Sequence, residues 1–248
     1  MKLGKREFQP DHRDLKLSKY MAPLPTPPAI FGFGTLYEDW GMLGNDRYGD
    51  CVFAGADHET MVWNKLRHGI DVKFSPKDAL ADYGAVTGFN PDDPNSDQGT
   101  DVRDAMKYRK ATGLLADDGK RHKIAAYVQI DPSNWDELVT ACFVFGCVGI
   151  GIEFPDSAMD QFNQGQMWDV VDGAQIEGGH YVPVVGSRLS SEKMTAITWG
   201  RRQEFTKAFY ERYCDEAWAM LSEEQIRSNG EGLHGLNLDQ LKADLAAL

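Results

Sequence analysis

The chain has 248 residues, and its 38 acidic against 26 basic side chains give a formal net charge of −12. A negative field repels phosphate backbones, and basic pairs such as Arg201 and Arg202 are isolated, so we expect no nucleic acid among the partners. The hydrophobic content of 42% is enough for a packed core and excludes a disordered chain. The longest apolar run, residues 141–152, is shorter than the roughly 20 residues of a membrane-spanning helix, so no membrane partner is expected.

The N-terminus and the cysteines indicate a compartment with reduced thiols. Residues 1–17 carry charges throughout and contain no apolar segment of the kind that a secretory signal needs. Cys51, Cys142, Cys147 and Cys214 are too few for a disulfide framework in a chain of this length, and they lack the paired spacing of a zinc site. We therefore expect the cytoplasm or a phage particle assembled there, and neither a metal ion nor an organic cofactor.

The first 40 residues are predicted to form an extended, proline-rich arm. Pro23, Pro25, Pro27 and Pro28 favour extended backbone and disfavour the interior of helices and strands. We expect this arm to wrap the folded domain rather than to build it.

The chain that follows the arm has helical patterning. After a turn-rich loop at residues 41–50, apolar residues recur at helical spacing from Cys51, and Gly69 marks the end of that helix. Ser75 is predicted to cap a second helix, which runs through Tyr83.

The middle of the chain alternates between helix and strand. Thr100 is predicted to cap a helix that ends at Gly113. Residues 124–130 indicate a strand, residues 131–146 a helix, and residues 147–154 a strand that is buried on both faces.

The second half of the chain is richer in strands, at residues 180–187 and 194–200. Four leucines of the tail form one helical stripe that docks on its own domain or binds a partner: Leu238, Leu241, Leu245 and Leu248. Helices first and strands later predict an α+β protein with two lobes, comprising a domain at 41–221 and a helical tail at 222–248.

Three residues with the chemistry of acyl transfer stand out. Cys51 begins a predicted helix, where unpaired backbone N–H groups and the helix dipole favour the thiolate, although a lone cysteine is usually a small buried hydrophobe. His180 follows two glycines, which let its imidazole reach into a cleft. Asn45, on the preceding loop, can point its amide at a developing oxyanion. Together they are the parts of a nucleophilic site.

The chain resembles the papain-like cysteine peptidase superfamily around these residues. Asn45–Cys51 is similar to the family's glutamine-to-nucleophile loop, and Gly179–Val182 to the strand that carries its histidine. Ile197–Gly200 is similar to its Asn-Ser-Trp-Gly turn. Residues 97–114 resemble its Asp-Gly-Gly segment with the following helix, and residues 146–154 its Pro-Val-x-Val strand.

This resemblance, which runs from about residue 40 to residue 221, implies a papain-like two-lobe fold with a cleft between the lobes. Cys51 would be the nucleophile on an N-terminal helical lobe, and His180 the base on a C-terminal β-rich lobe. Asn45 would hold the oxyanion and Trp199 would shield the histidine from water. The substrate would be a peptide or protein.

The chain departs from the family pattern beside both reactive groups. Ile197 stands where the family has the asparagine that orients the histidine, so Thr198 or Asp172 would have to replace it. Asp50 adds a negative charge next to the nucleophile, which opposes ionisation of the thiol. The cleft would be lined by Asp50 with Gly49 and by Gly179 with Trp199.

Three functions follow from this pattern. The first is a cysteine peptidase or amide hydrolase that uses a Cys51–His180 pair. The second is a catalytically weak or inactive papain-fold structural or binding protein, such as a component of a phage particle, which would contact other subunits through the arm or the C-terminal helix. The third is an amidase or acyl transferase.

Overall fold

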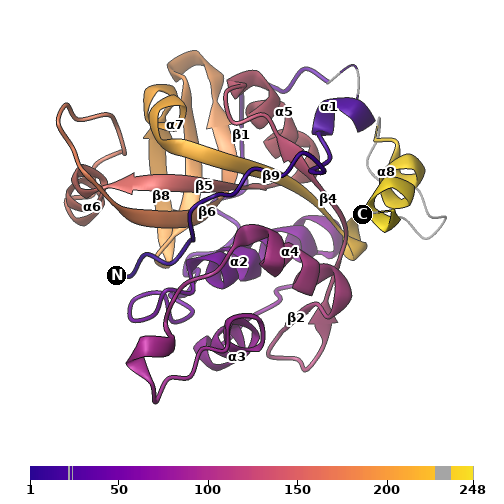
Figure 1. The fold of residues 1–248 in the computed structure, drawn as a ribbon. Coiled ribbons are helices and arrows are strands. Elements are labelled where there is room, and N and C mark those ends of the chain that lie inside the picture. Colours follow the sequence, from indigo (N-terminus) through magenta and orange to yellow (C-terminus); the bar gives the residue numbers. More distant parts are fainter. Residues whose placement is uncertain (22, 24, 227–235, 248) are drawn as a thin grey trace.

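A computed structural model gives the structure of residues 1–21, 23, 25–226 and 236–247. The chain forms two lobes, one of helices and one built on a seven-stranded antiparallel sheet (Figure 1). The strands lie in the order β4-β9-β5-β6-β7-β8, and β1 pairs with β6 beside this path. Their bounds are β1 Ile30–Gly32, β4 Ile124–Ile130, β5 Val148–Pro155, β6 Ile176–Arg188, β7 Lys193–Thr198, β8 Arg201–Thr206 and β9 Cys214–Ser222.

The helices cover both faces of this sheet. They are α1 Leu17–Tyr20, α2 Cys51–His68, α3 Pro76–Thr87, α4 Val102–Ala111, α5 Trp135–Phe145, α6 Asp156–Asn163, α7 Lys207–Tyr213 and α8 Leu238–Ala246, with 3₁₀ turns at Pro94–Ser96, Leu189–Ser191 and Glu223–Gln225. A hairpin of β2 (Leu114–Leu115) and β3 (Arg121–His122) belongs to the helical lobe. In the described part of the chain, no helix combines the length and the apolar character needed to cross a membrane.

The sheet separates two apolar cores, because successive side chains of a strand point to opposite faces. On β9, Trp218 and Met220 pack into the core of the helical lobe, around α2. Ala219 and Leu221 point to the other core, which α5 and α7 cover. The predicted α+β class is confirmed, and the predicted strand at residues 147–154 is found as β5, buried along nearly its whole length.

The N-terminal arm is less extended than its prolines predict. It contains the helical turn α1 and the strand β1, and Leu17, Tyr20 and Met21 are buried in the core of the sheet lobe. Burial of these apolar side chains stabilises the helical turn, which the proline content of the arm does not predict. In the tail, Leu238, Leu241 and Leu245 are buried on α8, whereas Leu248 lies outside the described residues. The predicted domain boundaries remain predictions.

The cap of α4 also differs from the prediction. Asp101, not Thr100, is the N-cap, and its carboxylate accepts hydrogen bonds from the backbone amides of Arg103 and Asp104. Thr100 is buried one residue earlier, where its backbone pairs with residues from the N-terminus of the chain.

A buried carboxylate joins the two lobes. Glu59, on α2, is fully buried; one of its oxygens lies 2.6 Å from Nη1 of Arg109 and the other accepts a 2.7 Å hydrogen bond from the hydroxyl of Tyr181. Arg109 belongs to α4 and Tyr181 to β6. Because a buried charge needs partners on all its acceptor atoms, this group fixes α2 against β6.

Replacing Tyr181 by Phe should destabilise the protein by about 1–3 kcal/mol, because one oxygen of Glu59 would stay buried without its donor. Urea unfolding measures this loss. The matched control is Tyr37→Phe, which removes a longer hydrogen bond, 3.3 Å to the carbonyl of Met61, from a half-buried position and should cost about 1 kcal/mol or less. Equal losses in the two variants would show that Glu59 does not clamp the lobes.

Candidate active site

Cys51 is the first residue of α2 and is 1% exposed. The backbone amides of Tyr181, on β6, and of Gly4, near the N-terminus of the chain, lie close enough to lower the pKa of the thiol, against the larger opposite effect of burial. Tyr181 directly follows His180, so the backbone of β6 next to His180 lies beside the start of α2.

His180 is held from two sides. Its Nε2 lies 2.7 Å from Oγ1 of Thr198, and the indole of Trp199 stacks on its ring with the centroids 4.4 Å apart and the planes at 15°. The ring of Phe154 meets it edge-on. Nδ1 is buried and has no hydrogen-bond partner among the described residues. Thr198, and not Asp172, is therefore the side chain on the second imidazole nitrogen.

The turn between β7 and β8 places the stacking indole. Trp199 has a φ of 46° and Gly200 a φ of 75°, both in the left-handed region. This conformation is unfavourable for a residue with a large side chain and is typical of functional sites. It turns Trp199 back onto the imidazole at the point where β7 ends.

Asn45 is buried on the loop before α2. Its Nδ2 donates to the carbonyl oxygen of Tyr48 at 3.0 Å and to that of Lys2 at 3.1 Å. The predicted oxyanion donor thus already binds a peptide carbonyl that belongs to the N-terminal residues of the same chain.

Asp50 and Gly49 lie between Asn45 and the nucleophile. The amide of Gly49 donates to Asp97 at 3.0 Å. Asp50 is fully buried, and this burial raises the pKa of its carboxyl group well above the ordinary range. The charge of Asp50 also raises the pKa of the Cys51 thiol, as the sequence predicts, because a neighbouring negative charge opposes the thiolate.

The N-terminal segment, residues 2–6, fills the space between the two lobes. In Figure 1 the chain starts at that position, marked N. The amides of Gly4 and Lys5 donate to the carbonyl of Gly179, at 3.1 and 3.0 Å. The amide of Thr100 donates to the carbonyl of Gly4 at 2.8 Å, and that of Arg6 to the carbonyl of Thr100 at 3.0 Å. One stretch of chain is thus paired with the walls of both lobes.

Glycines allow this close approach. A Cβ on Gly4 would collide with the backbone of Gly49, one on Gly99 with the backbone of Gly4, and one on Gly179 with the carbonyl of Lys5. Sequence reasoning selected Gly49 and Gly179 for the cleft but missed Gly4, Gly99 and the whole N-terminal segment. The glycines at these positions are the sequence signal that could have indicated a close approach of two backbones.

Burial keeps Cys51 and His180 uncharged. Burial is the main cause that raises the pKa of the Cys51 thiol to about 12, and it lowers the pKa of the His180 imidazole to about 3. Both shifts disfavour the charged forms, because water is excluded from both groups. With the N-terminal segment in place, the thiol and the imidazole are therefore both uncharged near neutral pH.

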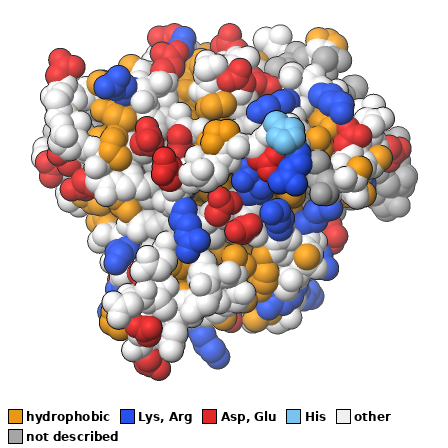
Figure 2. Space-filling model, viewed as in Figure 1, with side chains coloured by type: hydrophobic (Ala, Val, Ile, Leu, Met, Phe, Trp, Pro, Cys, Tyr) orange, Lys and Arg blue, Asp and Glu red, His pale blue; other side chains and the backbone are white. Residues whose placement is uncertain are grey.

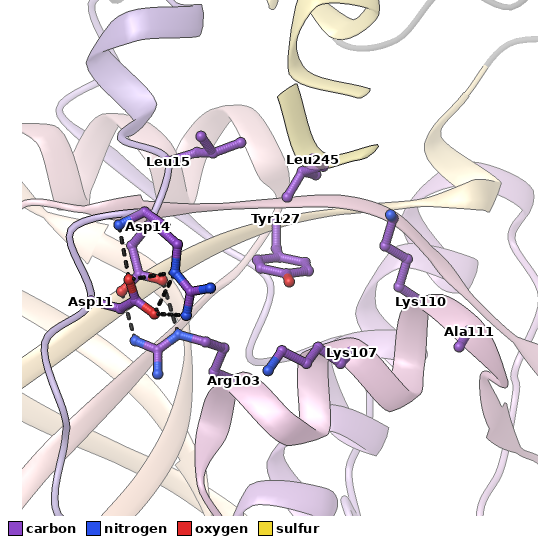
Figure 3. A pocket seen from close by; sticks show the side chains of 10 residues that line it. Asp11, Asp14, Leu15, Arg103, Lys107, Lys110, Ala111, Tyr127 and Leu245 are labelled. Carbon is purple, nitrogen blue, oxygen red and sulfur yellow. Dashed lines mark hydrogen bonds and ion pairs between the residues drawn. The ribbon is translucent and has the colours of Figure 1, made fainter. Parts of the chain in front are cut away.

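A surface pocket lies elsewhere, between the arm, α4 and α8, with a volume of about 490 Å³ (Figure 3). Basic side chains gather on this face of the molecule (Figure 2). Four line the pocket although they are scattered in the sequence: Arg13, Arg103, Lys107 and Lys110. Asp11 pairs with Arg13 and Asp14 with Arg103, so much of the positive charge is neutralised.

No group of three or more His, Cys, Asp or Glu side chains that could hold a metal ion occurs among the described residues. The pocket of Figure 3 contains none of the predicted site residues.

Neither a protein-family model nor a curated protein matches the chain. Several solved structures, however, are similar to it. Xylellain, a cysteine protease from Xylella fastidiosa, has a TM-score of 0.62 at 14% identity, over 88% of this chain and 95% of that one. Procathepsin B S9 from Trypanosoma congolense has a TM-score of 0.63 at 11% identity, over 89% and 87%. The cysteine protease and lectin-like domains of Cwp84 from Clostridium difficile give 0.59 at 14%, over 82% and 56%. These likenesses confirm the two-lobe fold predicted from the sequence.

The variant Gly4→Val tests whether the N-terminal segment covers Cys51. Its side chain has no room against Gly49, so the segment should leave the cleft and water should reach the thiol. The pKa of Cys51 then falls, and since each unit raises the thiolate fraction tenfold, alkylation by iodoacetamide near neutral pH should be at least about 10-fold faster. Mass spectrometry of the Cys51 peptide measures the rate.

The matched control is Glu7→Val, which adds the same side chain at an exposed position just after the segment. It should react as slowly as the unchanged protein. If all three proteins are alkylated at the same rate, the segment does not control access to the thiol.

Proposed function

We propose that this chain, which has the papain-like fold, is a cysteine hydrolase that cleaves peptide or amide bonds with the pair Cys51 and His180. The observation that carries the proposal is that one residue, Gly4, lies against the chain just before each of the two reactive groups: it touches Gly49, two residues before Cys51, and its amide donates to the carbonyl of Gly179, which precedes His180. Thr198 lies at Nε2 of the same histidine.

The reaction starts with the proton on Nε2, which donates to Thr198 and leaves Nδ1 as the base. Sγ of Cys51 attacks the carbonyl carbon while Nδ1 takes the thiol proton. The C=O π pair moves to oxygen, and Nδ2 of Asn45 with the backbone N–H of Cys51 stabilises this oxyanion. The protonated imidazole then gives its proton to the leaving amine, and the C–N bond breaks. Water, deprotonated by His180, releases the acid from the thioester and restores the thiol.

Thr198 has a limited part in this scheme. Its hydroxyl keeps the ring oriented and accepts from Nε2 in both protonation states of the imidazole. It carries no charge and adds little stabilisation to the imidazolium. General-base catalysis is typically worth about 10²–10⁴-fold, and an oriented ring retains most of that factor.

The N-terminal segment must leave before a substrate can enter. Gly179 and Thr100 present the backbone groups that an extended peptide would use in its place, and Asn45 already binds one of the segment's carbonyls. A peptide or protein chain therefore fits this cleft better than a compact small molecule does.

Two other functions remain alternatives. An amidase or acyl transferase would use the same pair with a different acyl donor or acceptor. A structural role in a phage particle needs no opening of the cleft, and the proteins with similar folds, whose titles name cysteine proteases, give it no support.

Activity should be measured in the Gly4→Val background on a mixture of unstructured peptides, by mass spectrometry of the products. Cys51→Ala and His180→Ala should each abolish cleavage. Thr198→Val, which keeps the shape but removes the hydroxyl, should lower kcat by about 10-fold, within the range of general-base effects, with little change in KM.

The control for Thr198→Val is Thr195→Val, which should retain full activity because Thr195 lies three residues earlier on the same strand and its side chain points to the opposite face. Cleavage that survives Cys51→Ala would exclude this site as its source, and no cleavage in a folded Gly4→Val protein would favour the structural alternative.

A further inference from the structure

Lys5 is the most unusual residue of the N-terminal segment. Its side chain is 1% exposed, and an ammonium group is rarely buried to this extent without compensating charges. Its Nζ lies 2.6 Å from Oδ2 of Asp215 and 3.3 Å from Oε1 of Glu216, and it donates to the carbonyl of Arg6 at 3.1 Å. All three ammonium donors therefore have acceptors.

The pocket around this ammonium is built mostly by the sheet lobe. Asp215 and Glu216 belong to β9, and Gly151 on β5 forms the wall along the lysine stem, where a Cβ would collide with Cε of Lys5. Glu216 is further held by the indole N–H of Trp218, which donates to Oε2 at 2.7 Å. The third acceptor, the carbonyl of Arg6, comes from the segment itself, as it would from the backbone of any bound peptide.

The strand register places this pocket beside the reactive pair. On β5, Gly151 pairs with Tyr181 on one side and with Glu216 on the other, and the next residue, Ile152, pairs with His180. The amides of Gly4 and Lys5 both donate to the carbonyl of Gly179, the residue before His180. A side chain in this pocket therefore belongs to a residue at most about two positions from the bond that Cys51 attacks.

We propose that this acidic pocket, the Lys5 pocket, selects a lysine or arginine side chain of the substrate, with Asp215 and Glu216 as the specificity-determining residues. The inference rests on the proposed function, since it names the substrate class of the same cleft. In the closed protein Lys5 is the competitor that holds this pocket, and an incoming basic residue takes its place.

Charge makes the selection strict. Burial raises the pKa of Glu216 to about 7 even though Lys5 opposes that rise, so a guest without charge would leave Asp215 and Glu216 without the cation that both now contact. Oδ1 of Asp215 is buried and has no partner among the described residues, which supplies a spare acceptor for the additional N–H groups of arginine. The net charge of −12 also draws basic peptides towards the protein.

Binding is tested on the full chain with Gly4→Val and Cys51→Ala, which opens the cleft and prevents turnover. The probes are fluorescent hexapeptides that differ at one residue, which is lysine or norleucine of nearly the same length, and that residue is placed in turn at each central position. The lysine peptide should bind about 10- to 100-fold more tightly at the favoured position, the ratio expected for a buried hydrogen bond to a charged group.

Asp215→Asn and Glu216→Gln should each bring that ratio towards one, whereas Glu211→Gln, which removes an exposed charge on α7 of the same lobe, should leave it unchanged. Asp215 is 18% exposed at the side chain, so its variant remains measurable if Glu216→Gln does not fold. Equal affinities for the two peptides at every position, or no binding of either, would overturn the proposal.

Cleavage by Gly4→Val with Cys51 intact is a separate readout. Cleavage of lysine and norleucine peptides at equal rates would refute the selection while supporting the hydrolase. Selective binding without any cleavage would support the pocket and contradict the proposed function.

Discussion

The position of helix α2 on strand β6 is the constraint on which the site depends. The buried carboxylate of Glu59 ties α2 to Tyr181 on β6 and to Arg109 on α4, so all three elements meet at one charge. Cys51 begins the same helix and His180 precedes the same tyrosine, so the clamp that joins the lobes also sets the place of the thiol relative to the imidazole. An uncharged core contact at this position would permit the lobes to slide, because dispersion forces have little directionality.

The N-terminal segment covers the cleft, and this explains why the Cys51 thiol and the His180 imidazole are both uncharged in this structure. The segment replaces water around both reactive groups, and burial then moves their pKa values in opposite directions, each away from the ion pair. Under the proposed function, a peptide substrate would use the groups that hold the segment: the carbonyl of Gly179, the backbone of Thr100 and the acidic Lys5 pocket.

The sequence was a good guide to local structure and a poor guide to long-range pairing. Cys51 at the start of a helix and His180 on a strand could be predicted, because capping position and β-branched runs are local signals. The pairing of Gly4 and Lys5 with Gly179 could not, since hydrogen bonds between backbones so distant in sequence leave no periodic pattern. The cap of α4 is also mispredicted by one residue, because the backbone of Thr100 pairs with Gly4 and Arg6 and the cap falls to Asp101.

The most direct test of the account is the titration of the His180 imidazole by NMR in the opened Gly4→Val protein, with and without Cys51→Ala. If thiol and imidazole form a pair, the pKa of His180 in the opened protein should rise well above its value in the closed chain, and Cys51→Ala should lower it again, because the thiolate that stabilises the imidazolium is gone. A pKa of His180 that is the same with and without the Cys51 thiol would contradict the pair and leave the histidine as a residue of the core.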